Sequence, residues 1–138
     1  MADKAKMELI KEFLETCPLL KKGKVNLDYI KEQPQSYSVD ETQVDPVLNE
    51  FRDGGRRLQI QFDFSIQANF SVLENIKNSM FCDKITNWVY EQNQIGNLPK
   101  IDGIDWIKCL GRGTITQTTE KTAIYSIPMQ VAYIEEAF

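Results

Sequence analysis

Histidine is absent from the 138-residue sequence. A chain without histidine has no Ser-His-Asp or Cys-His catalytic arrangement and no histidine metal ligand. The three cysteines, Cys17, Cys82 and Cys109, lie far apart and form no Cys-x-x-Cys pair, so the spacing of a structural zinc site is missing too. We therefore predict no catalytic, cofactor-binding or metal-binding residues, and a protein that is not an enzyme.

The chain also lacks an excess of basic charge and a long apolar run. Lys and Arg number 16 against 20 Asp and Glu, a net charge of −4, whereas non-specific binding to nucleic acid or anionic lipid needs an excess of cations. No apolar run approaches the roughly 18 residues that cross a bilayer. The charged start, MADKAKMELIKEFLE, lacks the apolar core of a signal peptide. We expect a protein that folds in a cytoplasm, its cysteines buried as thiols.

The most regular feature of the sequence is a long alternation of apolar and polar residues. Every even position from Leu58 to Phe70 is apolar, and every odd position from Arg57 to Asn69 is polar. A period of two predicts a β-strand with one buried face. At roughly 3.3 Å per residue, this strand would span about 43 Å, about twice the usual length.

Other segments predict two helices and several further strands. Apolar residues at helical spacing indicate an N-terminal helix over residues 3–16 and a central helix over residues 71–96, with a break at Asn78-Ser79. The apolar face of the central helix is predicted to hold Leu73, Ile76, Met80, Ile85, Trp88 and Val89. Short strands are expected at residues 24–29 and 37–39, and longer ones at 104–118 and 123–133.

This order of elements predicts one domain over residues 1–138 with an α+β fold. We expect a mixed, mostly antiparallel sheet with long strands, packed by the N-terminal and central helices in two layers. Pro128 cannot donate a ladder hydrogen bond, so the last strand is expected to lie at an edge of the sheet or to carry a bulge.

Residues 40–55 are predicted to form a long surface loop that carries an interaction. Five acidic residues and one cation, Arg52, make this segment too polar for a core element. Loops of such length in a compact domain are usually functional, and exposed apolar side chains mark a surface for a partner. Val47, Leu48 and Phe51 are therefore interface candidates.

The polar face of the long strand supplies the other interface candidates, Gln59, Gln61 and Gln67. Neutral amides pair with a backbone or with other amides without burying a charge. Two interpretations stay open: this face is in contact with solvent, or it meets another copy of the chain.

Several segments resemble a family of small tail proteins of phages and phage-like tail particles of Gram-positive bacteria, the tail terminators. The matching segments are residues 14–18 (LETCP), 23–29 (GKVNLDY), 75–81 (NIKNSMF), Trp88, 96–99 (GNLP), 119–125 (TEKTAIY) and 131–133 (VAY). The resemblance implies a mixed sheet flanked by helices and a homo-oligomeric ring of six subunits. Such a ring caps the tail tube, ends its polymerisation and joins the tail to the head or neck.

The resemblance also implies the partners and the location. They are the tail tube protein, the head–tail connector and, in contractile tails, the sheath protein. DNA would only pass through the lumen, with no specific binding, and no membrane is involved. The location would be the tail or neck of the virion, after assembly in the host cytoplasm.

Two alternatives remain. The first is a head–tail connector or neck subunit, which would bind the portal side rather than the end of the tube. The second is a small cytoplasmic enzyme or ligand-binding domain built on Asp, Glu or Lys side chains.

Overall fold

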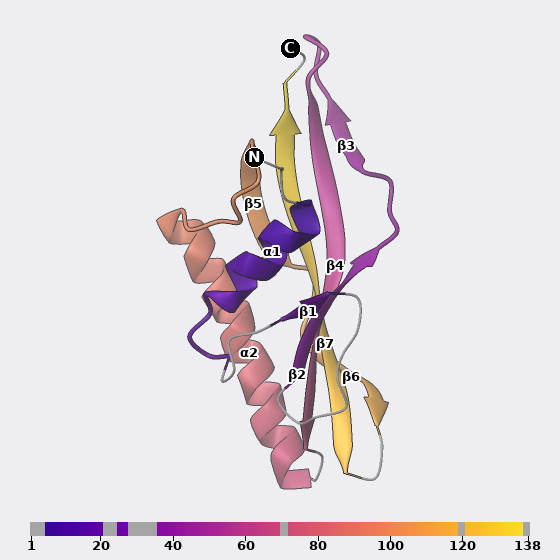
Figure 1. The fold of residues 1–138 in the computed structure, drawn as a ribbon, viewed down its shortest axis with the longest axis vertical. Helices are drawn as coiled ribbons and strands as arrows, with labels where there is room; N and C mark the ends of the chain where they lie inside the picture. The colour runs from indigo at the N-terminus through magenta and orange to yellow at the C-terminus, as the bar shows by residue number, and fades with distance from the viewer. Residues whose placement is uncertain (1–4, 21–24, 28–35, 70–71, 119–120, 137–138) are drawn as a thin grey trace.

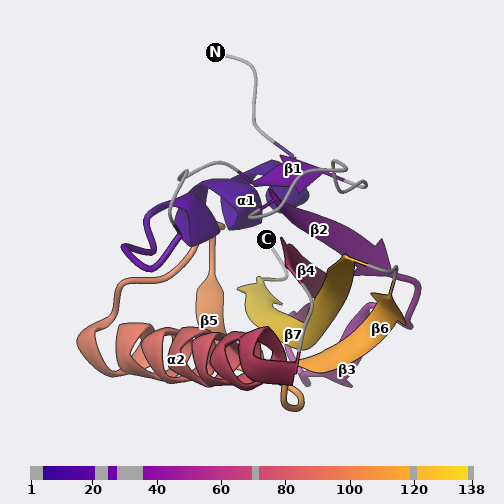
Figure 2. The same cartoon turned by 90° about the horizontal axis from the view of Figure 1, so that it is seen from below.

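The computed structural model describes residues 5–20, 25–27, 36–69, 72–118 and 121–136. It has the predicted α+β fold, in which two helices lie on one side of a mixed, mostly antiparallel sheet (Figures 1 and 2). The described elements are α1 (Lys6–Glu15), β1 (Asn26–Leu27), β2 (Ser36–Thr42), β3 (Val47–Glu50), β4 (Arg56–Asn69), α2 (Val72–Ile95), β5 (Ile104–Cys109), β6 (Thr114–Thr118) and β7 (Thr122–Glu135).

The centre of the sheet is an antiparallel pair of long strands, β4 and β7. The pairing runs from Arg56 opposite Glu135 to Asn69 opposite Thr122. Because both strands alternate, the even positions of β4 and the odd positions of β7 share one face. Phe62 lies opposite Met129 and Phe64 lies opposite Ile127, and all four are almost fully buried. The long alternating strand is thus confirmed, with β7 as its partner.

Each long strand is flanked on its outer side by two shorter strands. β2 and then β3 pair along β4, while β5 and then β6 pair along β7. The pair of β1 with β2 is parallel and the other described pairs are antiparallel. The four flanking strands therefore leave β4 and β7 without a free edge over most of their length.

The expectation that Pro128 marks an edge strand or a bulge in the last strand is wrong, because β7 is central. The backbone oxygen of Pro128 accepts a hydrogen bond from Leu110 N at 2.7 Å. In a strand, the N–H and C=O of one residue point to the same side. The donor that proline lacks would therefore point toward the break between β5 and β6, so proline is tolerated at this position.

The loop predicted for residues 40–55 is also wrong in its secondary structure. β2 continues to Thr42, β3 occupies Val47–Glu50, and a turn over residues 51–55 leads into β4. Asn49 pairs with Arg57 and Glu50 pairs with Arg56. Of the acidic residues that suggested a loop, Asp40 and Glu41 lie in β2 and Glu50 ends β3, while Asp45 and Asp53 lie in the connecting segments.

Helix α2 covers the apolar face of the sheet without the break predicted at Asn78-Ser79. Its buried positions are Cys82, Ile85, Val89 and Gln92, whereas Met80 is 56% exposed and does not belong to the apolar face. The side chains of residues 71–76, including the predicted Leu73 and Ile76, lie outside the described set.

The C-terminal end of α2 is closed at Gly96, as its sequence predicts. Gly96 has φ +78°, Gly96 N donates to Asn93 O, and Asn97 N donates to Gln92 O at 2.9 Å. These are the two hydrogen bonds of a Schellman motif, in which glycine takes the left-handed position.

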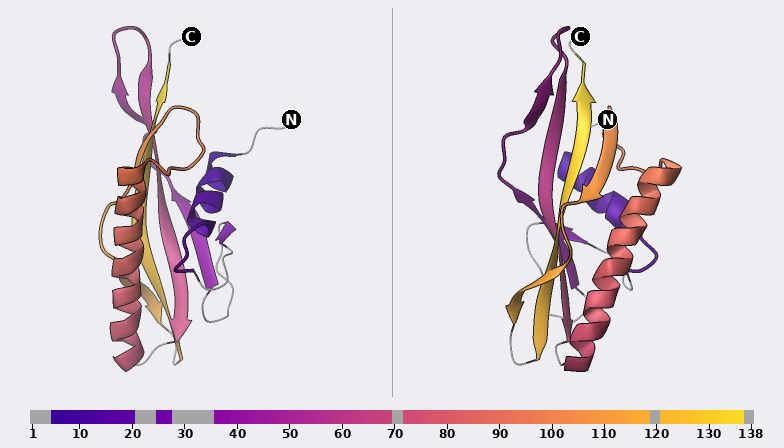
Figure 3. Two further views of the ribbon diagram at one scale, coloured as in Figure 1. Left: turned by 90° about the vertical axis from the view of Figure 1, so that its left-hand side faces the viewer. Right: turned by 180° about the vertical axis from the view of Figure 1, so that it is seen from behind.

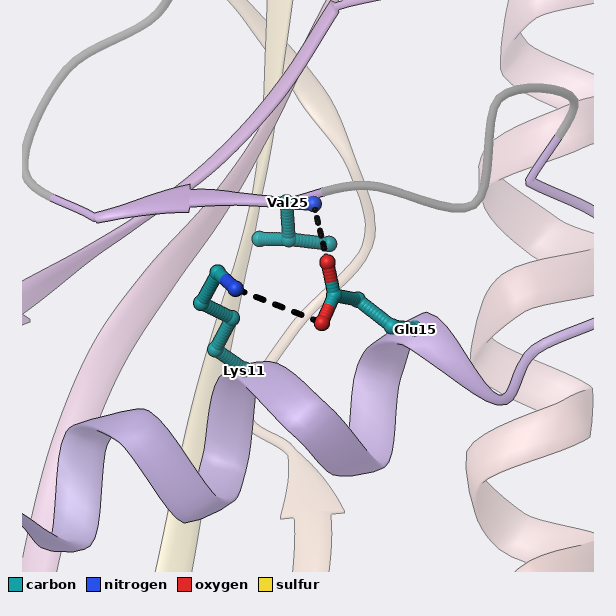
Figure 4. A network of polar contacts seen from close by, with 3 residues as sticks. All are labelled: Lys11, Glu15 and Val25. Carbon is teal, nitrogen blue, oxygen red and sulfur yellow. Dashed lines mark hydrogen bonds and ion pairs between the residues drawn. The ribbon is translucent and has the colours of Figure 1, made fainter. Parts of the chain in front are cut away.

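The N-terminal helix α1 is tied to the start of β1 through Glu15 (Figure 4). One carboxylate oxygen of Glu15 accepts a hydrogen bond from Val25 N at 3.0 Å, and the other lies 3.3 Å from Lys11 Nζ. Ile10, Phe13 and Leu14 bury the opposite side of the helix in the core. The helix predicted over residues 3–16 is thus present over Lys6–Glu15.

Candidate interaction surface

One end of the sheet projects past both helices. Figures 1 and 3 show the β3–β4 turn, together with the C-terminal end of β7, extending beyond α1, α2 and β5. We call residues 43–58 the arm; they comprise the segment between β2 and β3, β3 itself, the turn and the first residues of β4. The interface candidates Val47, Leu48 and Phe51 all lie in it.

The tip of the arm is a compact, hydrogen-bonded turn. Phe51 N donates to Gly55 O at 2.8 Å, and Gly54 N donates to Phe51 O at 3.0 Å. The carboxylate of Asp53 accepts from Gly55 N at 2.9 Å, and Gly54 has φ +91°. Such side-chain-to-backbone bonds define one turn conformation, so Phe51 is presented at a fixed place.

The base of the arm is held by Asp45, Pro46 and Gln59. Asp45 Oδ1 accepts from Val47 N at 3.0 Å, and the backbone oxygen of Asp45 accepts from Gln59 Nε2 at 2.8 Å. Pro46 O accepts from Gln59 N at 2.7 Å. These contacts join the segment between β2 and β3 to β4, so the arm continues the sheet.

Apolar side chains of the arm remain partly open to solvent. Phe51 is 39% exposed and Val44 is 36% exposed, while Val47 and Leu48 are half-buried. The structure therefore brings the predicted Val47, Leu48 and Phe51 onto one hairpin, and Val44 lies in the segment just before it. Apolar atoms on a projecting hairpin gain free energy when a partner covers them.

Of the predicted glutamines, Gln59 and Gln61 form hydrogen bonds within the sheet. Gln59 Oε1 accepts hydrogen bonds from Gln61 Nε2 at 2.9 Å and from Gln130 Nε2 at 2.6 Å. Gln67 is only 8% exposed. Gln59, Gln61 and Gln130 thus hydrogen-bond to one another. An interface role for Gln59, Gln61 and Gln67 stays a prediction.

Further along the polar face, small hydroxyl side chains continue this pattern. Ser65 Oγ and Ser126 Oγ lie 3.0 Å apart across β4 and β7, and Thr116 Oγ1 lies 3.4 Å from Ser126 Oγ. Ser38 is 1% exposed. On this face, Ser38, Ser65 and Gln67 are therefore buried polar residues, whereas Thr116 on β6 is exposed.

Ion pairs fasten the arm to neighbouring strands. Arg56 lies 2.6 Å from Glu135 at the end of β7, and Glu135 raises the pKa of the Arg56 guanidinium by hydrogen bonding. Arg57 Nε lies 3.2 Å from Asp105 Oδ2, close enough for an ion pair but outside hydrogen-bond geometry. Exposed pairs of this kind contribute little stability, because water and salt screen their charges. They join the arm to the end of β7 and to β5.

A cavity of about 180 Å³ lies between α1 and the segment after α2. It is lined by Leu9, Glu12, Phe13, Thr16, Asn97, Leu98, Pro99 and Lys100. Pockets for small ligands usually measure about 300–1,000 Å³. Within the described residues, His, Cys, Asp and Glu form no group of three or more that could hold a metal ion.

The cysteines are buried or half-buried thiols. Burial raises the pKa of Cys82 and of Cys109 to about 11, and burial also raises the pKa of Cys17. A thiol with so high a pKa is protonated at neutral pH and is a weak nucleophile.

These raised pKa values predict that the protein loses stability at alkaline pH. The unfolded thiol has a pKa of about 8.5, so between about pH 8.5 and 11 the unfolded chain has lost protons that the folded chain retains. The contribution of each buried thiol to the free energy of unfolding is complete below this range. As the pH rises through the range, each thiol lowers that free energy by up to about 1.4 kcal/mol per pH unit. Urea unfolding between pH 8 and 10 measures this slope. The slope should be smaller in Cys82→Ala, and an equal slope in both proteins would contradict the assignment.

Sequence reasoning missed several residues of this surface. Val44 stands out in the sequence with Val47, Leu48 and Phe51 as an apolar residue in an acidic segment, but it was not among the interface candidates. Gln130 was missed because its partner Gln59 is 71 positions away. The alternation in β7 was a usable signal for Gln130, since it places this residue on the polar face.

Comparison with known protein families found no family model that matches the sequence, and comparison with curated proteins found no significant match. Neither helix of the described residues is both long and apolar enough to cross a lipid bilayer.

Proposed function

We propose that this protein is a structural subunit of a phage-like tail, which forms a ring on the end of the tail tube, ends tube polymerisation and joins the tail to the neck. The observation that supports the proposal most is the arm: a hairpin that is fixed by backbone and side-chain hydrogen bonds and carries an exposed Phe51 beyond the helices. The segments that resemble tail terminators support it independently.

A ring subunit needs two different surfaces, because head-to-tail contacts join one patch of a subunit to another patch of the next. The arm provides one such surface, since it projects far enough to reach past its own helices (Figure 3). In this proposal, the exposed Phe51 and Val44 are covered by a neighbouring subunit or by the tube.

The charge of the chain suits a ring through which DNA passes. The net charge is −4, and the polar face consists mainly of neutral amides and hydroxyls. A cationic wall would bind phosphate groups and slow the passage of DNA.

The proposal predicts that the arm variant Phe51→Ser folds but caps tubes poorly. Because β3 belongs to the sheet, a point substitution tests the arm better than a deletion. We expect at least about a tenfold higher concentration for half-maximal capping, since an aromatic side chain in a binding contact contributes about 2 kcal/mol. Capping is measured as the fraction of purified tail tubes with a ring at one end in negative-stain images.

The matched control is Ile95→Ser, which removes a 73% exposed apolar side chain at the end of α2, away from the arm. This control should cap tubes like the wild type. Equal capping by Phe51→Ser would contradict the role of the arm, whereas rings that bind the portal side and not the tube would favour the connector instead.

A further inference from the structure

The cavity between α1 and the segment after α2 is mainly apolar. Its buried and half-buried walls include Phe13, Pro99, Leu9 and Leu98, whereas its exposed lining residues are polar: Thr16, Asn97 and Lys100. Apolar walls that water reaches favour an apolar occupant, because covering them removes apolar surface from water. The cavity is therefore suited to a group that is apolar at its end and polar around its base.

The cavity has the size of one aromatic ring. Its volume is about 180 Å³, and a cavity of about 150 Å³ lined by apolar side chains holds benzene. Ligands of cofactor or drug size usually occupy about 300–1,000 Å³. A single phenyl side chain therefore fits this cavity better than a free cofactor does.

The arm carries such a ring at a different place on the molecule. Phe51 is 39% exposed, and the hydrogen bonds of its turn hold it at the tip of a projecting hairpin. Tyr90 is the other exposed aromatic residue among those described, but it has a polar hydroxyl and lies on the side of α2. Phe51 is therefore the aromatic side chain that is best placed to enter a cavity.

Phe51 cannot fill the cavity of its own chain. Figures 1 and 3 show the turn of the arm at one end of the molecule, beyond α1 and α2. The cavity lies beside α1, and the arm is hydrogen-bonded into the sheet through Gln59. The ring and the cavity are thus two different patches, so the ring in the cavity has to come from another molecule.

The charges beside the ring match those beside the cavity. Glu50 and Arg52 flank Phe51 and are exposed, while Glu12 and Lys100 line the cavity. Neither Arg52 nor Lys100 forms an ion pair within the described part of the chain. The arm as a whole contains three acids and three cations, so no net charge on it opposes the contact. A second copy of the chain therefore brings an acid for Lys100 and a cation for Glu12.

We propose that Phe51 of one copy of this chain inserts into the cavity of a second copy, with Glu50 next to Lys100 of the second copy and Arg52 next to its Glu12. The contact is head-to-tail, since it joins two different patches, and each copy keeps one patch for a further neighbour. It gives the proposed ring its subunit interface, and in this respect it rests on the proposed function.

Cross-linking between two variants tests the contact. One protein carries Arg52→Cys and the other carries Lys100→Cys, so both keep the ring and the apolar walls, and the mixture is treated with a short bismaleimide. Mixed dimers should form. Arg52→Cys alone, or mixed with Asn87→Cys, should give no more dimer than the wild type with its native cysteines. Dimers of Arg52→Cys alone would mean that two arms meet, and an absence of mixed dimers would overturn the insertion.

Filling the cavity tests whether the ring enters it. Thr16 is exposed and lines the cavity, so the larger side chain of Thr16→Trp takes the space that Phe51 needs. This variant should raise the dissociation constant of self-association at least about tenfold, the effect of losing a central aromatic contact. In a Phe51→Ser background it should have little further effect. Asn87→Trp, at an exposed site of α2, is the control. Sedimentation equilibrium measures the constants, and urea unfolding confirms that each variant folds.

The outcomes separate this contact from the proposed function. Mixed dimers without an effect of Thr16→Trp would place the arm beside the cavity and contradict the insertion. If the protein is monomeric alone, the cross-linking is repeated with tail tubes, and caps that yield no mixed dimers overturn the contact while the proposed function stands. A wild type that neither associates nor caps tubes overturns both. Association with the expected results but without rings or capping supports the contact and overturns the proposed function.

Discussion

Replacing Gly103 by alanine should lower the free energy of unfolding by about 2–5 kcal/mol. Gly103 has φ +76°, which costs an alanine about 1–2 kcal/mol. A Cβ atom at this position would also lie 2.1 Å from the backbone oxygen of Ile134. This oxygen belongs to a strand that is paired on both sides, so it cannot move away without breaking other bonds. Accommodating such overlap costs about 1–3 kcal/mol more.

The Gly103 prediction has a matched control at Gly96. Gly96 has nearly the same backbone angle, φ +78°, but a Cβ atom there would meet nothing within 4 Å. Gly96→Ala should therefore lower the free energy of unfolding by only about 1 kcal/mol. Backbone strain lowers it, and the reduced conformational entropy of the unfolded alanine chain offsets part of this loss. Urea unfolding of both variants measures the difference. Equal losses would show that the approach of Gly103 to Ile134 is not important for stability.

Replacing Asn93 by aspartate should cost about 3 kcal/mol, because Asn93 joins α2 to the edge of β5. Asn93 Oδ1 accepts from Ile107 N at 3.0 Å, while Asn93 Nδ2 donates to Ile107 O and to Val89 O. The amide thus imitates the backbone of a neighbouring strand. Aspartate has no side-chain N–H donor, so Ile107 O would lose the donor that Asn93 supplies, and both Ile107 O and Val89 O would face a negative charge, although Val89 O keeps its helical hydrogen bond.

Asn87→Asp, at an exposed position of the same helix, is the control and should change stability by less than about 0.5 kcal/mol. Hydrogen exchange at Ile107 provides a second measurement. Repulsion from Ile107 O should turn the carboxylate away from Ile107 N, so that the amide of Ile107 exchanges faster in Asn93→Asp. A variant with wild-type stability and unchanged exchange would mean that the edge of β5 is closed by other contacts.

The sequence predicted the parts of the fold in which one face is buried and the other is polar. β4 alternates from Arg57 to Asn69, and every odd position of β7 from Ala123 to Tyr133 is apolar, so a period of two is visible in the residues themselves. The apolar face of α2 was predicted less well. Met80 fits the helical spacing but is 56% exposed, since spacing alone does not tell how far along a helix the sheet extends.

The wrong predictions for residues 40–55 and for Pro128 have a common physical cause, because both depend on which strands lie next to each other in the sheet. β3 is short and exposed at the sheet edge, so it shows no alternation, and its acidic residues looked like a loop. Pro128 indicated an edge because the break between β5 and β6, which tolerates it, cannot be seen in one sequence. Local patterns report burial, whereas edges and breaks depend on which strands become neighbours.

The candidate surface was predicted in part for the same reason. Val47, Leu48 and Phe51 were selected because apolar residues in an acidic segment need an explanation, and they lie together on the arm. The cavity between α1 and the segment after α2 required the fold, since its two walls are far apart in the sequence.

The mass of the purified protein in solution, measured alone and then with purified tail tubes, tests the ring proposal most directly. We expect particles of about six subunits, or monomers that assemble into caps at one end of tubes of uniform length. A strict monomer that leaves tubes uncapped and of variable length would contradict the proposed function.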